Sequence, residues 1–306
     1  MNFDSRVWKT GLVAVVATII LSVFVFRAAE WTRAINGEFV VYGQTSGGGS
    51  GGSGGGTGTA GVTFTRVIPQ IAVGSYDSLF NHVTVIQVVN TGSASINVSG
   101  NFYNPNGTAS TVAMTTNAAT VPTFTGTLAS TPLVANGVLV ITAATASTGT
   151  TNWGRIVTTG SASVSSYFEL RDFTTSALST RVGVPSSAND MAQFLIPRAR
   201  NVAANFDVGF AVVNTGGTAA NITGVVRDAA GTQIAARTVS LGARSHTANF
   251  AREFFTAAGC APCLGTEGAG TLYGFVTFTS ASAQFAAMAL SVEGGSLSSV
   301  ALDRLQ

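Results

Sequence analysis

Charged residues are scarce in this sequence. They make up 9% of its 306 residues, whereas a typical soluble domain carries about 25%. The 15 basic and 13 acidic residues leave a formal net charge of only +2. No basic stripe exists to neutralise phosphates, so the composition excludes nucleic acid as a partner. Serine, threonine, asparagine and glutamine must supply the surface polarity instead, and such uncharged surfaces suit extracellular modules.

Cysteine is also rare, with only Cys260 and Cys263 in the stretch GCAPCLG. A C-x-x-C pair can be a redox centre, half of a zinc site or a small structural disulfide. Zinc would need two more ligands, and His246 is the only nearby candidate. A thioredoxin-like centre would need a helix start within a βαβ unit, which the flanking sequence does not offer. We therefore expect a local disulfide and neither a metal nor a cofactor, with free thiols and redox or metal chemistry as the alternatives.

Residues suited to catalysis are few and scattered. The chain has 2 histidines. These are His82 and His246, for which we expect surface or capping roles. Glycosidase chemistry needs two carboxylates that converge across a cleft, but the acids are isolated along the chain. Glu169 and Asp172 flank Arg171 in FELRD, which indicates a surface ion pair. The sequence therefore predicts no catalytic residue and no enzymatic activity.

A long apolar run occurs near the N-terminus. After a tail at residues 1–10, GLVAVVATIILSVFVF spans residues 11–26 and would reach about 24 Å as a helix, against a hydrocarbon core of about 30 Å. Trp8 and Trp31 flank it, and indole rings favour the membrane interface. We predict a transmembrane helix over residues 11–33. The alternative is a cleaved signal peptide, although the cleavage site is poor. Both interpretations export the rest of the chain.

Glycine dominates much of the next segment, residues 34–61. The stretch QTSGGGSGGSGGGTGTAG at residues 44–61 gains no packing and loses much backbone freedom on ordering, so we expect a flexible tether. Its matches to the G-x-S-x-G hydrolase motif lack the strand and helix that a nucleophile elbow needs. The preceding EFVVYG, at residues 38–43, is either a juxtamembrane connector or a strand free to pair with a domain or a neighbouring chain.

One phrase is written twice in the chain. VVNTGSASINVSGNFYNPNG at residues 88–107 and VVNTGGTAANITGVVRDAAG at residues 212–231 are identical at 8 of 20 positions. The similarity continues upstream and downstream with small shifts in spacing, as loop insertions and deletions produce. The sequence thus predicts a tandem duplication, with repeat 1 at residues 62–187 and repeat 2 at residues 190–306.

Alternating apolar positions mark strands inside both repeats. INVSGNFY places Ile96, Val98, Gly100 and Phe102 on one face, and NITGVV has the same period of two. Turn signals such as NTGS, NPNG and DAAG separate the strands. Short strands at this spacing, without alternating helices, predict an all-β fold of two tandem antiparallel β-sandwich (Ig-like) domains after the transmembrane helix and the glycine-rich linker.

A single helix is expected in repeat 2. HTANFAREFFTAAG at residues 246–259 brings its phenylalanines to one face of a helix. Thr247 would cap its N-terminus, and Gly259 would follow its C-terminus. We expect this helix to cover one end of the second sandwich.

The order of motifs resembles a known sequence type. An I-P-x-x-A start, then VVNTGS and YNPNG, then GSASV, FELRD and GVPSS, is similar to tandem repeats in predicted secreted and cell-surface bacterial proteins of unassigned function. The resemblance covers roughly residues 64–300. Because the matching motifs are turn and core residues, it implies export and paired β-sandwiches and no particular activity.

These features favour a membrane-anchored extracytoplasmic protein with a structural or adhesive role. Its expected partners are the membrane, through the N-terminal helix, and either surface glycans and proteins or copies of itself. Three glycosylation acceptor patterns begin at Asn97, Asn106 and Asn221, so these side chains are candidate modification sites.

Two alternative functions remain open. The first is a self-assembling subunit of a surface filament or sheath, in which EFVVYG would exchange between neighbours. The second is a carbohydrate-binding or carbohydrate-cleaving protein, which would need exposed coplanar rings. The aromatic residues available for such a platform are Tyr76, Tyr103, Trp153, Tyr167 and Tyr273.

Overall fold

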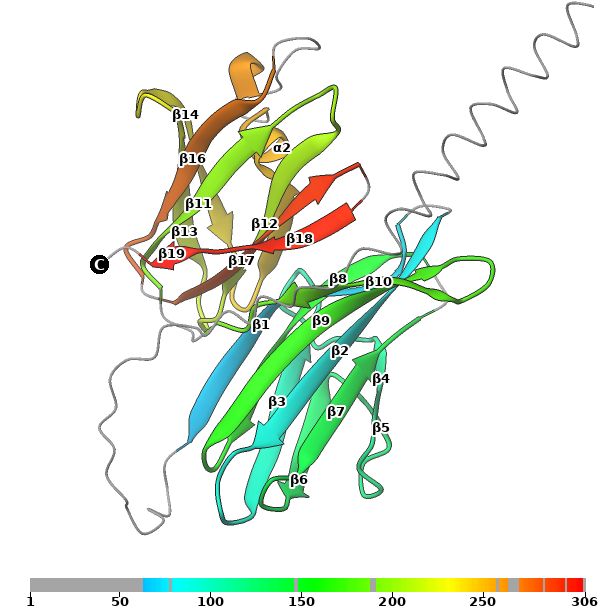
Figure 1. Cartoon of the computed structure of the whole chain (residues 1–306). Helices are drawn as coiled ribbons and strands as arrows, with labels where there is room; N and C mark the ends of the chain where they lie inside the picture. The colour runs from blue at the N-terminus through cyan, green and yellow to red at the C-terminus, as the bar shows by residue number, and fades with distance from the viewer. Residues whose placement is uncertain are drawn as a thin grey trace, which may run out of the picture. The chain divides into compact units, whose positions relative to one another are not determined.

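The computed structural model describes residues 63–304 except 77–78, 146–147, 188–190, 257–258, 264–269, 283 and 295. The tail, the transmembrane helix, the EFVVYG segment and the glycine tether, all predicted before residue 62, lie outside the described residues. The described part is built from several antiparallel sheets and almost no helix (Figure 1), which confirms the all-β prediction. Within it, no helix has the length and apolar character needed to cross a membrane.

The described part of repeat 1 folds into strands that pair in two groups. In the first group β1 pairs with β8, β8 with β3 and β3 with β6. In the second, β10 pairs with β9, β9 with β2, β2 with β7, β7 with β4 and β4 with β5. The end of β1 also pairs with β2, so β1 passes from one group to the other. The strands are β1 (Phe64–Ser75), β2 (Phe80–Asn90), β3 (Ile96–Tyr103), β4 (Ala113–Thr116), β5 (Thr123–Thr125), β6 (Thr127–Leu133), β7 (Val138–Ala143), β8 (Thr150–Thr158), β9 (Ala162–Asp172) and β10 (Leu178–Val184).

Repeat 2 forms two further sheets in its described part. One has the order β14-β13-β16-β11-β19, and the other has the order β15-β12-β17-β18. A short α-helix and a 3-10 turn interrupt the strands. The elements are β11 (Gln193–Arg200), β12 (Phe206–Asn214), β13 (Ala220–Asp228), β14 (Gln233–Leu241), β15 (His246–Phe250), α2 (Ala251–Thr256), η1 (Ala261–Cys263), β16 (Leu272–Thr279), β17 (Phe285–Glu293), β18 (Ser296–Val300) and β19 (Asp303–Arg304).

The two repeats share one pairing scheme. The order β1-β8-β3-β6 in repeat 1 corresponds to β11-β16-β13-β14 in repeat 2, and β7-β2-β9-β10 corresponds to β15-β12-β17-β18. Repeat 1 adds β4 and β5 beside β7, whereas repeat 2 adds β19 beside β11 and the helix α2 after β15. Loops can change in length after a duplication while the strand order persists. The shared scheme therefore agrees with the repetition seen in the sequence.

The repeated asparagine is a buried clamp in both repeats. The Asn90 side-chain amide donates to the carbonyl oxygens of Ala94, Leu133 and Val134 at 2.8, 3.1 and 2.9 Å. Its carbonyl oxygen accepts from the backbone N–H of Gly92 at 2.9 Å. Each clamp thus ties the turn after one strand to the end of another strand, far away in sequence.

The second copy repeats this arrangement bond for bond. The Asn214 amide donates to the carbonyl oxygens of Thr218, Leu241 and Gly242 at 2.8, 3.1 and 2.9 Å, and its oxygen accepts from Gly216 N–H at 3.0 Å. The VVNTG phrase therefore recurs because each fold needs this asparagine, in addition to the turn itself.

A glycine recurs in the core for lack of space. The buried positions of β3 alternate as predicted, and Gly100 lies on its buried face. In repeat 2, a Cβ atom on Gly224 would lie 2.9 Å from a ring carbon of Phe278 and 3.0 Å from one of Phe254. Real Cβ atoms do not approach side chains that closely, so glycine at this position makes room for the rings.

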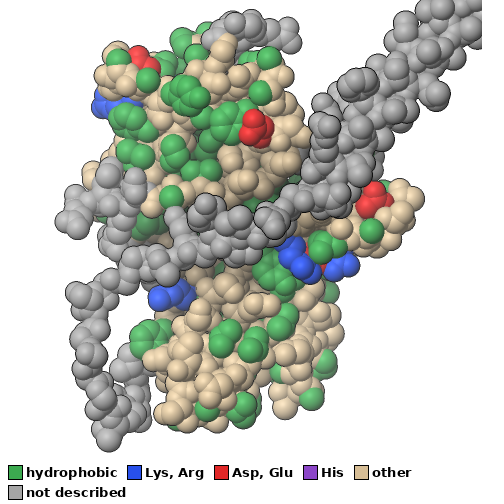
Figure 2. Space-filling model, viewed as in Figure 1, with side chains coloured by type: hydrophobic (Ala, Val, Ile, Leu, Met, Phe, Trp, Pro, Cys, Tyr) green, Lys and Arg blue, Asp and Glu red, His purple; other side chains and the backbone are tan. Residues whose placement is uncertain are grey.

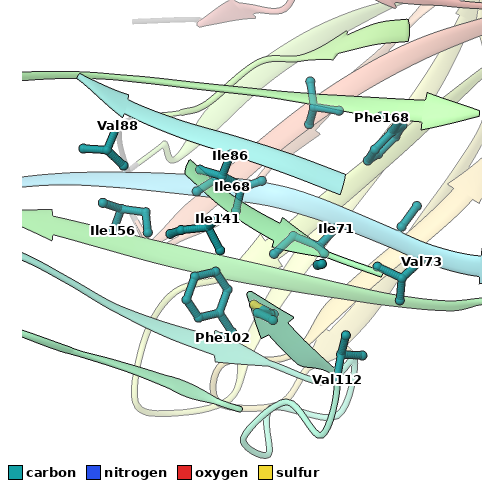
Figure 3. Close-up of a cluster of buried hydrophobic side chains, with 14 of the residues drawn as sticks. Ile68, Ile71, Val73, Ile86, Val88, Phe102, Val112, Ile141, Ile156 and Phe168 are labelled. Atoms are coloured by element: carbon teal, nitrogen blue, oxygen red, sulfur yellow. The ribbon is translucent and has the colours of Figure 1, made fainter. Parts of the chain in front are cut away.

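Each repeat encloses its own cluster of apolar side chains between its two groups of strands. In repeat 1, Ile68 and Phe102 come from one group and Ile86 comes from the other, and Figure 3 shows these side chains gathered in the space between the strands. The cluster of repeat 2 is rich in phenylalanine, with the Phe210 ring centroid 4.8 Å from that of Phe278. Burial of these side chains is the main stabilising term available to so uncharged a chain.

The helix predicted at residues 246–259 is confirmed only in part, because its first five residues form a strand. Residues His246–Phe250 form β15, which pairs with β12, and of the residues described in this range Ala251–Thr256 are helical. Thr247 is therefore no helix cap, because it pairs within the sheet. The helix does bury phenylalanine side chains, as expected, at Phe254 and Phe255. Pairing with a neighbouring strand has overridden the helical spacing of the apolar residues.

Candidate functional site

The three candidate glycosylation asparagines are all exposed. Asn97 in β3 and Asn221 in β13 lie on the outward face of corresponding strands. Asn106 lies in the turn after β3, where its side-chain oxygen accepts from the Thr108 hydroxyl at 2.7 Å. Their modification stays a prediction, but the side chains are accessible at each position.

The two cysteines are joined by a disulfide bond, with their Cα atoms 5.4 Å apart. Both are buried in the repeat 2 cluster just after α2. The Arg198 guanidinium, itself buried, donates to the Cys263 carbonyl oxygen at 3.2 Å. Among the residues that the structure describes, no group of three or more His, Cys, Asp or Glu side chains is placed to hold a metal ion. The disulfide thus closes the loop over the core.

The surface ion pair expected in FELRD needs correction. Glu169 is buried, and its carboxylate binds both Arg171 and Arg181. Burial alone would raise the pKa of Glu169, but hydrogen bonds from the two guanidinium groups hold it below its usual value. Asp172 takes no part in this cluster, because its side chain accepts from the backbone N–H groups of Thr174 and Thr175 and orders a turn. The two carboxylates do not converge on a shared site.

A second buried carboxylate was not singled out from the sequence. Asp207 in β12 is bound by Arg200 of β11, at 3.0 Å, and by Arg252 of α2. Burial raises its pKa, and the Val208 N–H and the two guanidinium groups only partly offset this effect. Such a buried ion pair fixes how elements meet but adds little net stability.

The histidines occupy two different environments. The ring of His82 lies edge-on to the ring of Tyr76, with centroids 4.9 Å apart. His246 is 5% exposed, so the expected surface or capping role is wrong for this residue. Neither of its ring nitrogens has a hydrogen-bond partner within the described chain. Burial lowers the pKa of His246 to about 4, so the imidazole is neutral at pH 7.

The aromatic residues considered for a carbohydrate platform do not form one. Trp153 is fully buried and Tyr103 stacks on it, with ring centroids 4.6 Å apart. Tyr273 is 64% exposed on β16 of repeat 2, whereas the exposed Tyr76 follows β1 of repeat 1 and its ring contacts His82. The ring of Tyr167 lies beneath the Arg181 guanidinium. Among these five described rings, Tyr103 and Trp153 form the stacked pair, and this pair is packed inside the structure instead of lying on an exposed face.

Trp153 and Tyr103 belong to the surface where the two repeats meet, here called the inter-repeat interface. The repeats form one compact unit. The Trp153 indole N–H donates to the Arg244 carbonyl oxygen at 2.7 Å, and an Arg155 guanidinium N–H donates to the Thr215 carbonyl oxygen at 2.9 Å. These directed bonds across the boundary specify one arrangement of the repeats.

A turn of repeat 1 packs closely against a turn of repeat 2. The His246 backbone N–H donates to the Pro105 carbonyl oxygen at 2.9 Å. Gly107 has a φ of 85°, and a Cβ on it would lie 2.1 Å from the Ala243 carbonyl oxygen. Two features therefore require glycine at position 107: the positive φ of its backbone and the close approach of the other repeat.

The apolar part of the interface comes from one sheet of repeat 2. Alternate residues of β12 and β17 face away from their own core, and Ala211, Met288 and Leu290 join the buried cluster of repeat 1. Val213 and Ala286 form a smaller cluster with Val67 and Trp153. This sheet is therefore buried on both faces.

A cavity of about 320 Å³ lies within the interface. Its walls come from β1, β2, β8 and β9 of repeat 1 and from β12, β15, α2, β17 and β18 of repeat 2, so neither repeat forms it alone. Most of the lining is apolar. The lining residues from repeat 1 are Gln70, Ala72, Tyr76, His82, Thr151 and Phe168, and those from repeat 2 include Phe210, Ala211, Ala248, Asn249, Phe250, Glu253, Met288, Leu290, Val292 and Leu297.

A sequence signal for this interface exists in β17. Its first six residues, FAAMAL, are all buried, and a continuous apolar run is typical of a strand covered on both faces. The small alanines let the sheets approach closely. The partner of the second face cannot be read from the run itself. No protein-family model matches this chain, and no curated protein matches it either.

Proposed function

We propose that this chain is a membrane-anchored extracytoplasmic protein that presents two tandem Ig-like β-sandwiches and acts in adhesion or structural spacing, without catalysis. The shared pairing scheme of the repeats supports the tandem sandwiches. The inter-repeat interface supports a presentation of both modules as one unit. The apolar run at residues 11–26 supports the anchor.

The observation that carries the proposal is an outward row of uncharged side chains. Across four adjacent strands of repeat 2, Gln193 is paired with Thr279, Thr279 with Thr223, and Thr223 with Thr238. The hydroxyl oxygens of Thr223 and Thr238 are 2.8 Å apart. Figure 2 shows few acidic or basic side chains on the face that it presents. Such neutral hydroxyl faces suit contact with surface glycans or proteins outside the cell.

The placement of the acids supports a role other than catalysis. Glu169 and Asp207 are each bound by two arginines, and one of these, Arg252, also binds Glu253. A general acid or base needs a proton that it can exchange with a substrate. These two carboxylates instead fix the packing of strands.

Cell fractionation with N-terminal sequencing tests the proposal. We expect the native protein in the membrane fraction, with its first residues intact, and we expect protease added to whole cells to digest both repeats. A protein that resists external protease in intact cells and is recovered in the cytosol would contradict the proposal. Recovery in the medium after removal of the N-terminal segment would replace the anchor by a signal peptide.

A self-assembling surface filament is the second candidate, favoured by one edge strand. Strand β14 spans 9 residues, contains no proline and pairs only with β13 in the described sheet. Long unprotected edge strands can accept a strand from another chain. Electron microscopy of the purified protein separates the candidates, because monodisperse particles exclude the filament.

A further inference from the structure

We propose that the cavity in the inter-repeat interface binds a small amphiphile with an apolar body and an uncharged or cationic head group. This binding function goes beyond the adhesive or structural role proposed above and does not depend on it.

The size of the cavity suits a small ligand. Ligand pockets usually begin near 300 Å³ and are mostly apolar with a few polar groups, and this cavity has about 320 Å³. An apolar cavity of about 150 Å³ is enough to bind benzene. By that scale the cavity holds a body of roughly twice the size of benzene.

The apolar wall of the cavity favours a ring system. Phe168 of repeat 1 and Phe210 of repeat 2 are both almost fully buried and line it from opposite repeats. Met288 and Leu290 of β17 complete this wall. Aromatic rings gain from edge or offset contacts with a bound ring, and methionine adapts its shape to an irregular ligand.

The polar lining lies where side chains reach solvent. Tyr76, 47% exposed, donates its hydroxyl hydrogen to the Thr150 carbonyl oxygen, and its ring contacts His82. Glu253 is half exposed, and one of its oxygens accepts from the Phe250 N–H at 3.3 Å. These groups, together with Asn249, offer a head group both hydrogen-bond acceptors and donors.

Charge decides which head group is accepted. Among the described residues that line the cavity, Glu253 is the carboxylate, and neither lysine nor arginine contributes to the lining. Arg252 lies beside the cavity lining, but its guanidinium already binds both Glu253 and Asp207. A carboxylate or phosphate head would therefore lose its hydration next to Glu253 without gaining a cation of its own, which is costly. An ammonium group gains the attraction of Glu253, and a hydroxyl or amide avoids the penalty.

Three naphthalene derivatives with one body and different heads test the proposal. The full chain in lipid nanodiscs is titrated with 1-naphthylmethylamine, 1-naphthalenemethanol and 1-naphthoate, with empty nanodiscs as the blank. We expect the amine and the alcohol to bind at least tenfold more tightly than the carboxylate. Equal affinity for all three, or tightest binding of the carboxylate, would overturn the proposal.

Variants locate the bound molecule. Ala248 lines the cavity and is half-buried, so Ala248→Phe fills it and should weaken binding of the amine at least tenfold. Ala236→Phe makes the same change on the exposed side of β14 and should leave binding unchanged. Leu297→Phe narrows the same cavity at its partly buried edge and replaces Ala248→Phe should that variant not fold. Unchanged binding in a folded cavity-filling variant would show that the probe binds elsewhere.

Glu253→Gln tests the head-group argument separately. The side chain keeps its size and loses its charge, so the amine should lose its advantage over the alcohol while the alcohol binds as before. An amine preference that survives this change would refute the role of Glu253.

Discussion

Replacement of the clamp asparagines tests the account of the repeated phrase. Asn214→Ala removes three carbonyl contacts and the bond from Gly216 N–H. The amide has two hydrogens, so the three carbonyl contacts amount to two full bonds, and three bonds are lost in all. A typical buried hydrogen bond contributes about 0.5–1.5 kcal/mol net. The expected loss is therefore about 2–4 kcal/mol in the free energy of unfolding.

Repeat 1 supplies a matched second measurement. Asn90→Ala removes the same set of bonds and should cost a similar amount. Asn221→Ala is the control, because this asparagine is exposed on β13 and surface changes usually stay within about 0.5 kcal/mol. Urea unfolding of the full chain, followed by the β-sheet signal in circular dichroism, measures all three. The reasoning fails if the clamp variants lose no more stability than Asn221→Ala does.

Three further predictions concern burial and packing. The pKa of His246 is about 4 in the folded protein instead of 6.5, so the unfolded state binds more protons as pH falls from 6.5 to 4, and the free energy of unfolding should fall by about 3 kcal/mol over that range. In urea titrations His246→Phe should lack this part of the pH dependence, and an identical dependence of the unfolding free energy on pH in both proteins would contradict the prediction. Gly224→Ala places a Cβ against three phenylalanine rings and should lower the free energy of unfolding by about 1–3 kcal/mol. Gly183→Ala is the control, because a Cβ there has no neighbour within 4 Å, and it should lower that free energy far less; equal losses of stability would refute the packing argument. Reduction of the Cys260–Cys263 disulfide should lower the unfolding free energy by about 2 kcal/mol and leave the β-sheet signal in circular dichroism at 25 °C unchanged, so loss of that signal on reduction would show that the bond does more than close a loop.

Local patterns in the sequence were sufficient for much of the strand structure. In β3 the alternation of Ile96, Val98, Gly100 and Phe102 is visible without a partner strand, because side chains on a strand alternate between faces. The turn residues are equally local: Gly107 adopts a φ of 85° in the NPNG turn. Such features depend on neighbouring positions alone.

The features that escaped prediction depend on distant partners. HTANF has helical spacing, but its pairing with β12 decides its conformation. The His246 backbone N–H donates to Pro105 of repeat 1, and the ion pairs of Asp207 join residues of three separate elements. The sequence signal for the interface is the FAAMAL run of β17. This run predicts a strand buried on both faces, but it does not identify the residues that cover the second face.

The inter-repeat interface joins two unlike faces, and this limits how the architecture can grow. Phe275 occupies in repeat 2 the place that Trp153 holds in repeat 1, yet it is partly exposed whereas Trp153 is fully buried. The sheet β7-β2-β9-β10 of repeat 1 corresponds to the interface sheet β15-β12-β17-β18 of repeat 2. It carries the ion pair of Glu169 and Arg181 where Val292 and Leu297 are paired in the other copy. A third module could not attach through the same interface, because a head-to-tail series needs both faces of that interface on every module. The duplication has thus produced a closed pair rather than the start of an array.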